Sequence, residues 1–231
     1  NKRDCVVFIS AEAPVKNFDM LNNNLKMSLN FCQALNYNSL NHLIYVSSDA
    51  VYKDINKPIT ENSKTEPNSL HGIMHLMREN IFKRIFKNKL LILRPTLIYG
   101  IHDNHLGYGP NLFLNKAINK KKLELFGNGE ERRDHLYIDD LITILIESIE
   151  KRTYGILNVA SGKINSFFKI AKFINKLTGN NEKIKKLRRN GPMPHNGYRA
   201  FNIRTITKNF KKTKITLIGD GIKKYYSNKI K

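Results

Sequence analysis

Two histidines, His71 and His75, stand four residues apart in a segment whose apolar residues recur with helical spacing. Residues four apart lie one turn from each other on the same face of a helix. An imidazole has an unperturbed pKa of about 6.5, so it exchanges protons near neutral pH without a helper group. Ser48 and Asp49 follow the apolar run 42–46, which predicts a buried strand. His71 and His75 are therefore candidates for proton transfer, and Ser48 and Asp49 stand at the end of the predicted strand.

Other interpretations of these residues stay open. A His-x-x-x-His pair on a helix can be half of a zinc site, but no third-ligand motif stands nearby, so no metal is expected. His71 and His75 could also fill a cavity in a chain that does no catalysis. Asp49 could equally be a cap for the loop that begins after the strand.

The elements that must position these residues alternate along the first 160 residues. The sequence predicts strands at 5–9, 42–46, 90–93 and 155–159, and helices at 18–35, 70–87 and 138–150. Short, continuous apolar runs are typical of parallel strands that are covered on both faces. The alternation predicts an α/β fold with a doubly wound parallel sheet. Residues 101–134 are rich in Gly and Asn around one helix, and the chain from 161 is helical, then irregular and very basic.

Charge and composition exclude several classes of partner. The net charge of +21 over 231 residues could favour nucleic acid. However, Lys, Asn and Ile are enriched together, and their A/T-rich codons explain the charge without a ligand. The basic clusters 120–122 and 183–189 also lack the interleaved aromatic residues of a base-stacking surface. No run of eighteen apolar residues exists, so neither nucleic acid nor a membrane is an expected partner.

Several segments, taken in order, resemble the extended short-chain dehydrogenase/reductase family of nucleotide-sugar epimerases, dehydratases and reductases. That family places Ser or Thr at a strand end and Tyr-x-x-x-Lys on the next helix, about two dozen residues later. Here Ser48 fills the first position, but His71 and His75 stand in the Tyr and Lys positions. The resemblance therefore implies Ser48, His71 and His75, together with Asp49 after Ser48, as the catalytic residues. The other similar segments are 4–11, 24–34, 94–100 and 126–140.

The resemblance implies a Rossmann-like dinucleotide-binding domain, residues 1–100 and 135–160, and a small discontinuous substrate lobe, residues 101–134 and 161–231. It implies NAD or NADP as cofactor and a nucleotide sugar as substrate. The implied cofactor-binding residues are Ser10, Ala11, Asn24, Ser47, His75 and Pro95. The implied substrate-binding residues are Asn111, Arg133 and Arg199, with Arg188 and Arg189 as alternatives to Arg199. A surface salt bridge with Glu131 or Asp134 is the alternative role of Arg133.

The resemblance also narrows the reaction. In its dehydratases an acidic pair follows the Thr, whereas here Asp49 is followed by Ala50. Epimerisation or carbonyl reduction therefore fits better than dehydration, in support of surface polysaccharide synthesis. The alternative is a non-catalytic cofactor-binding or regulatory protein of the same fold. Leu97 replaces an Asn that commonly contacts substrate, and a leucine cannot donate that hydrogen bond.

The family opens with a glycine-rich turn that binds the dinucleotide pyrophosphate, and no such turn occurs in this sequence. We therefore expect a fragment that lacks about sixty residues of the dinucleotide-binding fold. The strand at 5–9 would then be a bare hydrophobic edge. We further expect a cytoplasmic protein that forms a homodimer through the helices near 18–35 and 70–87, because both carry apolar residues on more than one face.

Overall fold

Four parallel strands form the main sheet of the computed structural model, which describes residues 4–35, 40–101, 107–210 and 213–230. The strands lie in the order β1 (Cys5–Phe8), β2 (His42–Val46), β3 (Leu90–Pro95) and β7 (Gly155–Val159). Strands β2 and β3 are buried along almost their whole length, as expected of short apolar runs inside a parallel sheet. The predicted α/β fold with a parallel Rossmann-like sheet is confirmed.

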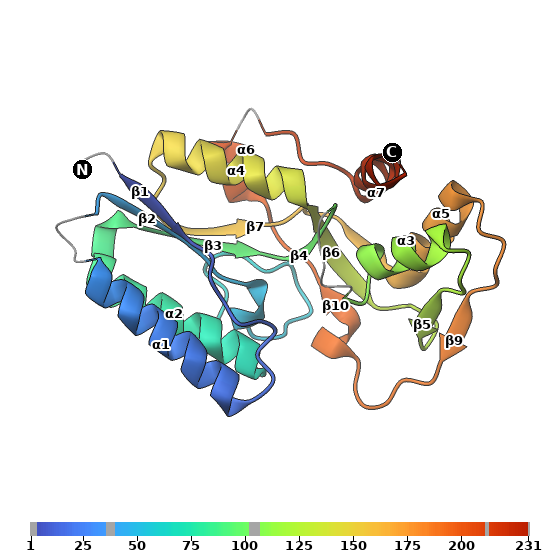
Figure 1. Cartoon of the computed structure of the whole chain (residues 1–231), viewed down its shortest axis with the longest axis horizontal. Coiled ribbons are helices and arrows are strands. Elements are labelled where there is room, and N and C mark those ends of the chain that lie inside the picture. Colours follow the sequence, from blue (N-terminus) through green and yellow to red (C-terminus); the bar gives the residue numbers. More distant parts are fainter. Residues whose placement is uncertain (1–3, 36–39, 102–106, 211–212, 231) are drawn as a thin grey trace.

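Helices cover both faces of this sheet (Figure 1). One layer holds α1 (Phe18–Ala34) and α2 (Leu70–Phe86), which pack on each other. The other holds α4 (Ile138–Lys151) and the short α6 (Arg204–Asn209). Each layer buries its own hydrophobic cluster against the sheet, and burial is the main force that holds such layers together.

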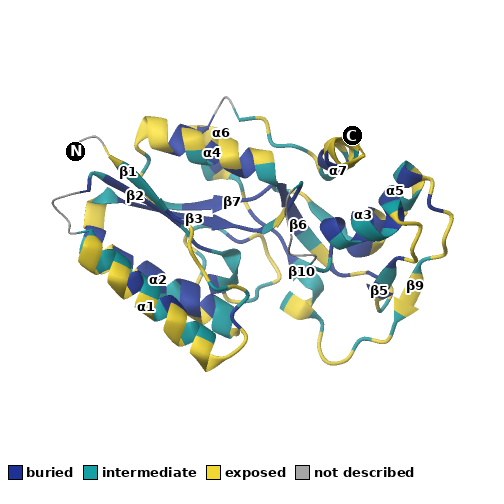
Figure 2. Cartoon of the chain, viewed as in Figure 1, coloured by how far each residue is buried: buried dark blue, intermediate teal, exposed yellow. Residues whose placement is uncertain are grey.

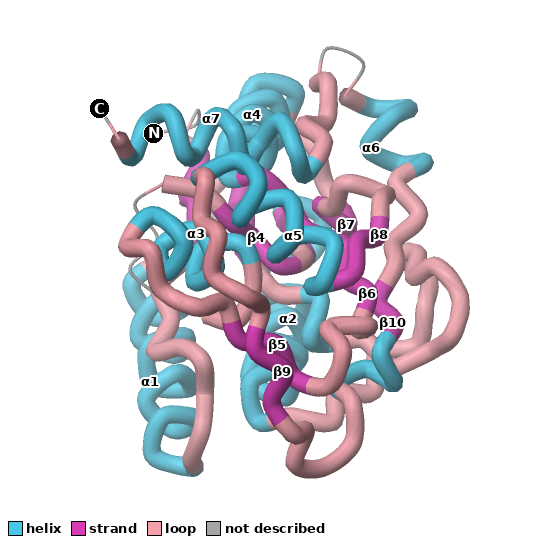
Figure 3. The backbone as a smooth tube through the Cα atoms, turned by 90° about the vertical axis from the view of Figure 1, so that its right-hand side faces the viewer, coloured by secondary structure: helices cyan, strands magenta, loops and turns pink. Residues whose placement is uncertain are grey.

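A second sheet joins the main sheet to a smaller lobe. Strand β6 (Arg132–Tyr137) pairs with β4 (Leu97–Tyr99), β8 (Ile164–Ser166) and β10 (Tyr198–Arg199). The lobe itself contains α3 (Pro110–Ile118), α5 (Phe167–Thr178), α7 (Ile218–Lys229) and the strand pair β5 (Glu124–Phe126) and β9 (Lys185–Leu187). Figure 3 shows α3, α5 and α7 gathered above the β5–β9 pair. The short 3-10 helices are Asp49–Val51, Lys87–Lys89 and Pro194–Gly197.

The basic C-terminal segment is irregular over part of its length, as expected, but it also contains regular elements. Strands β9 and β10 and helices α6 and α7 are all formed there. Their apolar residues are few, and frequent lysines interrupt the pattern, but tertiary packing stabilises them. In α7, Ile222 and Tyr225 stand three residues apart and are buried in the lobe core, whereas Ile206 of α6 joins the cluster that α4 buries against the main sheet. The predicted domain boundaries themselves stay a prediction.

Strand β1 lies at the edge of the main sheet, as the sequence led us to expect. Figure 2 shows it less buried than β2 and β3. Cys5, Val6 and Val7 are half-buried, and Ile9 just beyond the strand is 66% exposed. Phe18 in the α1–α2 layer is also exposed, and the homodimer through these helices stays a prediction. In the part of the chain that the structure describes, no helix is long and apolar enough to cross a membrane.

A buried ion pair fixes helix α2 to the sheet. The Arg94 guanidinium at the end of β3 donates two hydrogen bonds to the Glu79 carboxylate, with Nε–Oε1 2.8 Å and Nη2–Oε2 2.5 Å. The Ser47 hydroxyl, just after β2, donates to the same Oε1 at 2.8 Å. Glu79 is fully buried and Arg94 is 2% exposed. One residue of α2 therefore ties the helix to the ends of two neighbouring strands.

This geometry makes Glu79→Ala strongly destabilising, because Arg94 would keep a buried charge without its partner. We expect a loss of about 3–5 kcal/mol in the free energy of unfolding, measured by urea denaturation. The matched control is Glu66→Ala, which removes an exposed carboxylate paired with Lys53 and Lys64. That substitution should leave the unfolding midpoint unchanged. An equal free energy of unfolding in the two variants would contradict the anchoring role of Glu79.

Candidate functional site

The predicted site residues of the main sheet gather at the carboxyl ends of its parallel strands, where open α/β sheets bind their ligands. Ser10 and Ala11 follow β1 and are exposed. Ser47 follows β2, and Pro95 ends β3, and both are buried. The Ser47 hydroxyl is bound to Glu79, so the structure gives this side chain an anchoring contact.

Ser48, Asp49 and the first turn of α2 lie together because Gly72 has no side chain. A Cβ at Gly72 would overlap the carbonyl oxygen of Ala50. The segment after β2 therefore approaches the helix more closely than any other residue type would permit. The Ser48 hydroxyl accepts a hydrogen bond from the Ala50 amide at 3.1 Å and starts the 3-10 helix. This approach packs the 3-10 helix Asp49–Val51 against α2 and brings the Asp49 carboxylate close enough to His71 to act on its charge.

His71 lies in the first turn of α2 with an unsatisfied ring nitrogen. Its Nδ1 is buried and has no hydrogen-bond partner among the described residues. Burial lowers the pKa of His71 below its ordinary value, and the negative charge of Asp49 partly opposes this shift. Buried polar atoms are nearly always paired, so an unpaired imidazole nitrogen at a strand-end site is a candidate for contact with a ligand.

His75 occupies a different environment one turn later. Its Nδ1 shares a hydrogen bond of 2.7 Å with the hydroxyl of Tyr45 from β2, and the side chain is 6% exposed. Burial lowers the pKa of His75 to about 3, and the nearby His71 and Arg78 act in the same direction. The two imidazole rings meet edge to face, with centroids 4.7 Å apart. The position that carries a lysine in the family pattern therefore holds a neutral group at neutral pH.

Asn24 is placed to organise the segment after β1. It is completely buried, its Nδ2 donates to the Glu12 carbonyl at 2.9 Å, and its Oδ1 accepts from the Glu12 amide at 3.1 Å. The carbonyl of Asn24 accepts from Arg78 of α2 at 2.8 Å, and Arg78 also donates to the Ser10 carbonyl at 2.7 Å. Sequence patterns gave no signal for Arg78, although it links α1, α2 and the end of β1.

Asp49 is held by Arg199 across a long stretch of sequence. The Arg199 Nε donates to Asp49 Oδ2 at 3.1 Å, and its Nη1 donates to Asp54 Oδ1 at 2.8 Å. His195 contacts the same Asp54 oxygen at 2.5 Å. Arg199 is only 1% exposed, so its guanidinium is committed to these carboxylates. A substrate-binding role for Arg199 stays a prediction, whereas its contact with Asp49 is direct.

Arg133 lies in a second cluster of charges, on β6. Its Nη1 donates to Glu131 Oε1 at 3.1 Å, and Nη1 of Arg189 lies 3.6 Å from the other oxygen of Glu131. The Glu131 side chain is 6% exposed, and that of Arg133 is 11% exposed. The predicted ion pair between Arg133 and Glu131 is therefore present, but it is not a surface pair. Of the three candidate arginines, Arg189 is the one whose guanidinium shares a carboxylate with Arg133.

Asn111 lies in the first turn of α3, and its side chain contacts the segment that follows β4. It is 4% exposed, and its Oδ1 accepts from the Gly100 amide at 3.1 Å. It lines a cavity of about 190 Å³ together with Leu97 and His135. His135 was not among the residues that sequence patterns indicated. Within the described ranges, no group of His, Cys, Asp and Glu side chains could hold a metal ion.

Comparisons with known proteins agree with this architecture. The sequence model of the NAD dependent epimerase/dehydratase family matches residues 8–160. A putative UDP-glucose 4-epimerase of Methanocaldococcus jannaschii is 25% identical over 173 residues, which cover 71% of this chain and 55% of that protein. The dTDP-4-dehydro-6-deoxyglucose reductase of Escherichia coli is 30% identical over 148 residues, covering 61% of this chain and 46% of that protein. This chain thus spans about half the length of these relatives.

Solved structures share the fold over nearly the whole chain. The UDP-N-acetylglucosamine 4-epimerase of Methanobrevibacter ruminantium superposes with a TM-score of 0.86 and 23% identity, covering 98% of this chain and 76% of that one. The UDP-glucuronic acid 4-epimerase of Bacillus cereus, solved with NAD, has a TM-score of 0.83 and 20% identity, covering 99% of this chain and 76% of that one. The family model covers well over half of the sequence. This chain belongs to the NAD dependent epimerase/dehydratase family.

Proposed function

We propose that this protein is an NAD- or NADP-dependent enzyme that epimerises or reduces a nucleotide-activated sugar, with His71 as its general acid/base. One observation carries the proposal: His71 has a buried, unpartnered Nδ1 and lies close enough to the Asp49 carboxylate, after β2, for that charge to affect its pKa. Similar proteins include UDP-sugar epimerases and dTDP-sugar reductases, which supports the substrate class.

The cofactor would lie along the carboxyl ends of β1, β2 and β3. Ser10 and Ala11 are exposed there and can contact it, and Pro95 borders the same edge. The unpaired Nδ1 of His71 at this edge fits the nicotinamide end of a dinucleotide, where a proton must move. When bound, the nicotinamide accepts or returns a hydride at the reacting carbon of the sugar. His75 can contact the cofactor through hydrogen bonds, but it supplies no positive charge.

In the oxidising direction, neutral His71 takes the proton of the sugar hydroxyl as that carbon loses its hydride. The Ser48 hydroxyl donates a hydrogen bond to the same sugar oxygen. The Asp49 carboxylate, held by Arg199, stabilises the protonated imidazole that results. Return of the hydride to the opposite face of the sugar carbon, with the proton given back by His71, would complete an epimerisation. Ala50 beside Asp49 offers no second acid or base, which disfavours elimination of water.

The diphosphate of the sugar nucleotide would bind at Arg133 and Arg189. Both guanidinium groups contact the buried Glu131 carboxylate, each at a different oxygen, so that one side chain links the two arginines. A planar guanidinium offers paired N–H donors that match phosphate oxygens. The proposal therefore assigns binding to this arginine pair, and assigns Arg199 the positioning of Asp49.

His71→Phe tests the acid/base role. Turnover of a nucleotide sugar should fall by about 10²- to 10⁴-fold, because the ring keeps its volume but loses its exchangeable proton. Circular dichroism should show that the variant is folded. Ile73→Ala, which shortens an exposed side chain of the same helix, is the control and should keep wild-type turnover. Unchanged turnover in His71→Phe would leave His71 as a packing residue.

Arg133→Ala tests the diphosphate site. Calorimetry should show UDP or dTDP binding weakened by roughly 1.5–3 kcal/mol, as for loss of a hydrogen bond to a charged group. Lys121→Ala removes an exposed cation elsewhere on the lobe and should change binding only through screened attraction. Tight nucleic-acid binding that falls steeply with salt and survives Arg133→Ala would overturn the proposed substrate class.

A further inference from the structure

The cavity beside Asn111 is apolar except at a few points. It measures about 190 Å³, and residues of β4, of the segment before α3 and of β6 form its walls. Its apolar lining residues are Leu97, Ile98, Tyr99, Tyr108 and Pro110, and His135 and Asn111 supply side-chain polar groups. Sites for whole small-molecule ligands usually measure about 300–1,000 Å³, so this cavity is sized for one ring of a larger ligand.

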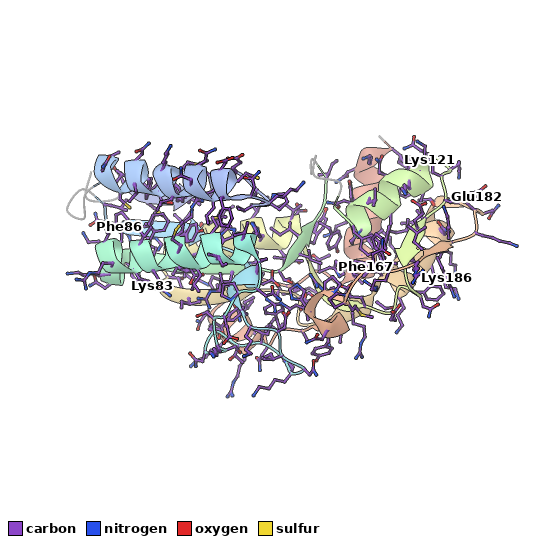
Figure 4. The ribbon with its side chains drawn as sticks, turned by 90° about the horizontal axis from the view of Figure 1, so that it is seen from below. Lys83, Phe86, Lys121, Phe167, Glu182 and Lys186 are labelled. Atoms are coloured by element: carbon purple, nitrogen blue, oxygen red, sulfur yellow. The ribbon has the colours of Figure 1, made fainter. Side chains whose placement is uncertain are left out.

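His135 has an unpaired nitrogen at this cavity. The side chain is 2% exposed, and its Nε2 has no hydrogen-bond partner among the described residues. The ring contacts Phe167 edge to face at 5.5 Å, and Figure 4 shows Phe167 inside the lobe, away from the outer rim where Lys121 and Glu182 lie. A buried polar atom without a partner is rare in folded proteins and requires an explanation.

Hydrogen bonding determines what this nitrogen can do. His135 Nδ1 lies 3.2 Å from the carbonyl oxygen of Arg133, and a carbonyl can only accept, so Nδ1 carries the proton. Burial lowers the pKa of His135 to about 3, and the ring is therefore neutral at neutral pH. Nε2 is then a hydrogen-bond acceptor, and its missing partner must be a donor.

Gly109 leaves room for such a partner. Its φ of +142° lies in a region that favours glycine. A Cβ at this position would stand 3.9 Å from His135 Nε2 and 3.5 Å from the Phe167 ring. Any side chain here would therefore cover the nitrogen and the neighbouring wall of the cavity.

We propose that His135 Nε2 accepts a hydrogen bond from a single O–H or N–H donor on an otherwise apolar edge of the bound ligand. The inference rests on the proposed function, since it names a further contact for a nucleotide sugar. Arg133 and His135 stand two residues apart on β6, so their side chains leave the strand on the same side. A ligand held by its diphosphate at Arg133 can thus place a neighbouring ring in the cavity. The donor is a sugar hydroxyl or an N–H of the base.

Two substitutions separate the two ring nitrogens. The amide of His135→Asn can keep the donation to the Arg133 carbonyl but has no atom at the position of Nε2. The longer His135→Gln can return an acceptor to that position. His42→Asn is the matched control: this buried histidine of β2 has partners for both nitrogens, Cys5 Sγ and the Thr153 carbonyl, far from the cavity. Calorimetry on the 231-residue chain would measure the Kd of UDP-glucose, dTDP-glucose, UDP and dTDP.

We expect His135→Asn to raise the Kd of the bound nucleotide sugar about tenfold, because the ligand donor would be left unpaired. His135→Gln should recover most of the affinity, and His42→Asn should bind as the wild type does. A loss confined to the sugar nucleotides identifies a hydroxyl of the transferred hexose as the donor, whereas an equal loss with UDP or dTDP places the donor on the nucleoside, in its base or its pentose.

Wild-type affinity in His135→Asn would overturn the inference and leave the proposed function standing. So would a loss that His135→Gln does not reduce, since the acceptor atom would then be irrelevant. Failure of the wild-type chain to bind any of the four nucleotides would instead reject the proposed substrate class, and the inference with it.

Discussion

The position of helix α2 depends on the buried contact between Glu79 and Arg94, and most of the site depends on that helix. The Glu79 carboxylate accepts two hydrogen bonds from Arg94 and one from the Ser47 hydroxyl. A shift of the helix along the sheet would leave the charges of Glu79 and Arg94 buried without their partners. Gly72, in the first turn of the same helix, lets the segment after β2 pack closely against that turn. These two contacts fix the position of the first turn and of His71, which stands next to Gly72.

The charges of this site differ from those of the Tyr and Lys pattern that the sequence resembles. His75 is neutral and bound to Tyr45, so the site has no ammonium group at that position. A tyrosine at position 71 would therefore lack the cation that lowers its proton affinity, whereas an imidazole needs none. The remaining cations serve other purposes: Arg199 is bound to Asp49, and Arg78 holds the ends of β1 and α1. A histidine in the Tyr position and a neutral histidine in the Lys position are therefore chemically compatible with each other.

The sequence predicted the main sheet and its covering helices, because those features follow from local periodicity. It could not predict that Arg199 binds Asp49, 150 residues away, or that Arg189 shares Glu131 with Arg133. Such pairs join segments that have no periodic relation. The sequence did not indicate His135 as a site residue, for a different reason. Its role comes from an absent partner and from a neighbouring glycine, which only the packed structure reveals.

The central claim is that a neutral imidazole at position 71 moves the proton, and the pH dependence of kcat/KM tests it most directly. Oxidation of a nucleotide sugar would be followed from about pH 4.5 to 9, with circular dichroism at each pH to confirm folding. Because burial lowers the pKa of His71, activity should hold through neutral pH and fall only as the pH drops below about 6.5. An activity that instead rises with an ionisation near that of tyrosine, about 10, would contradict the account.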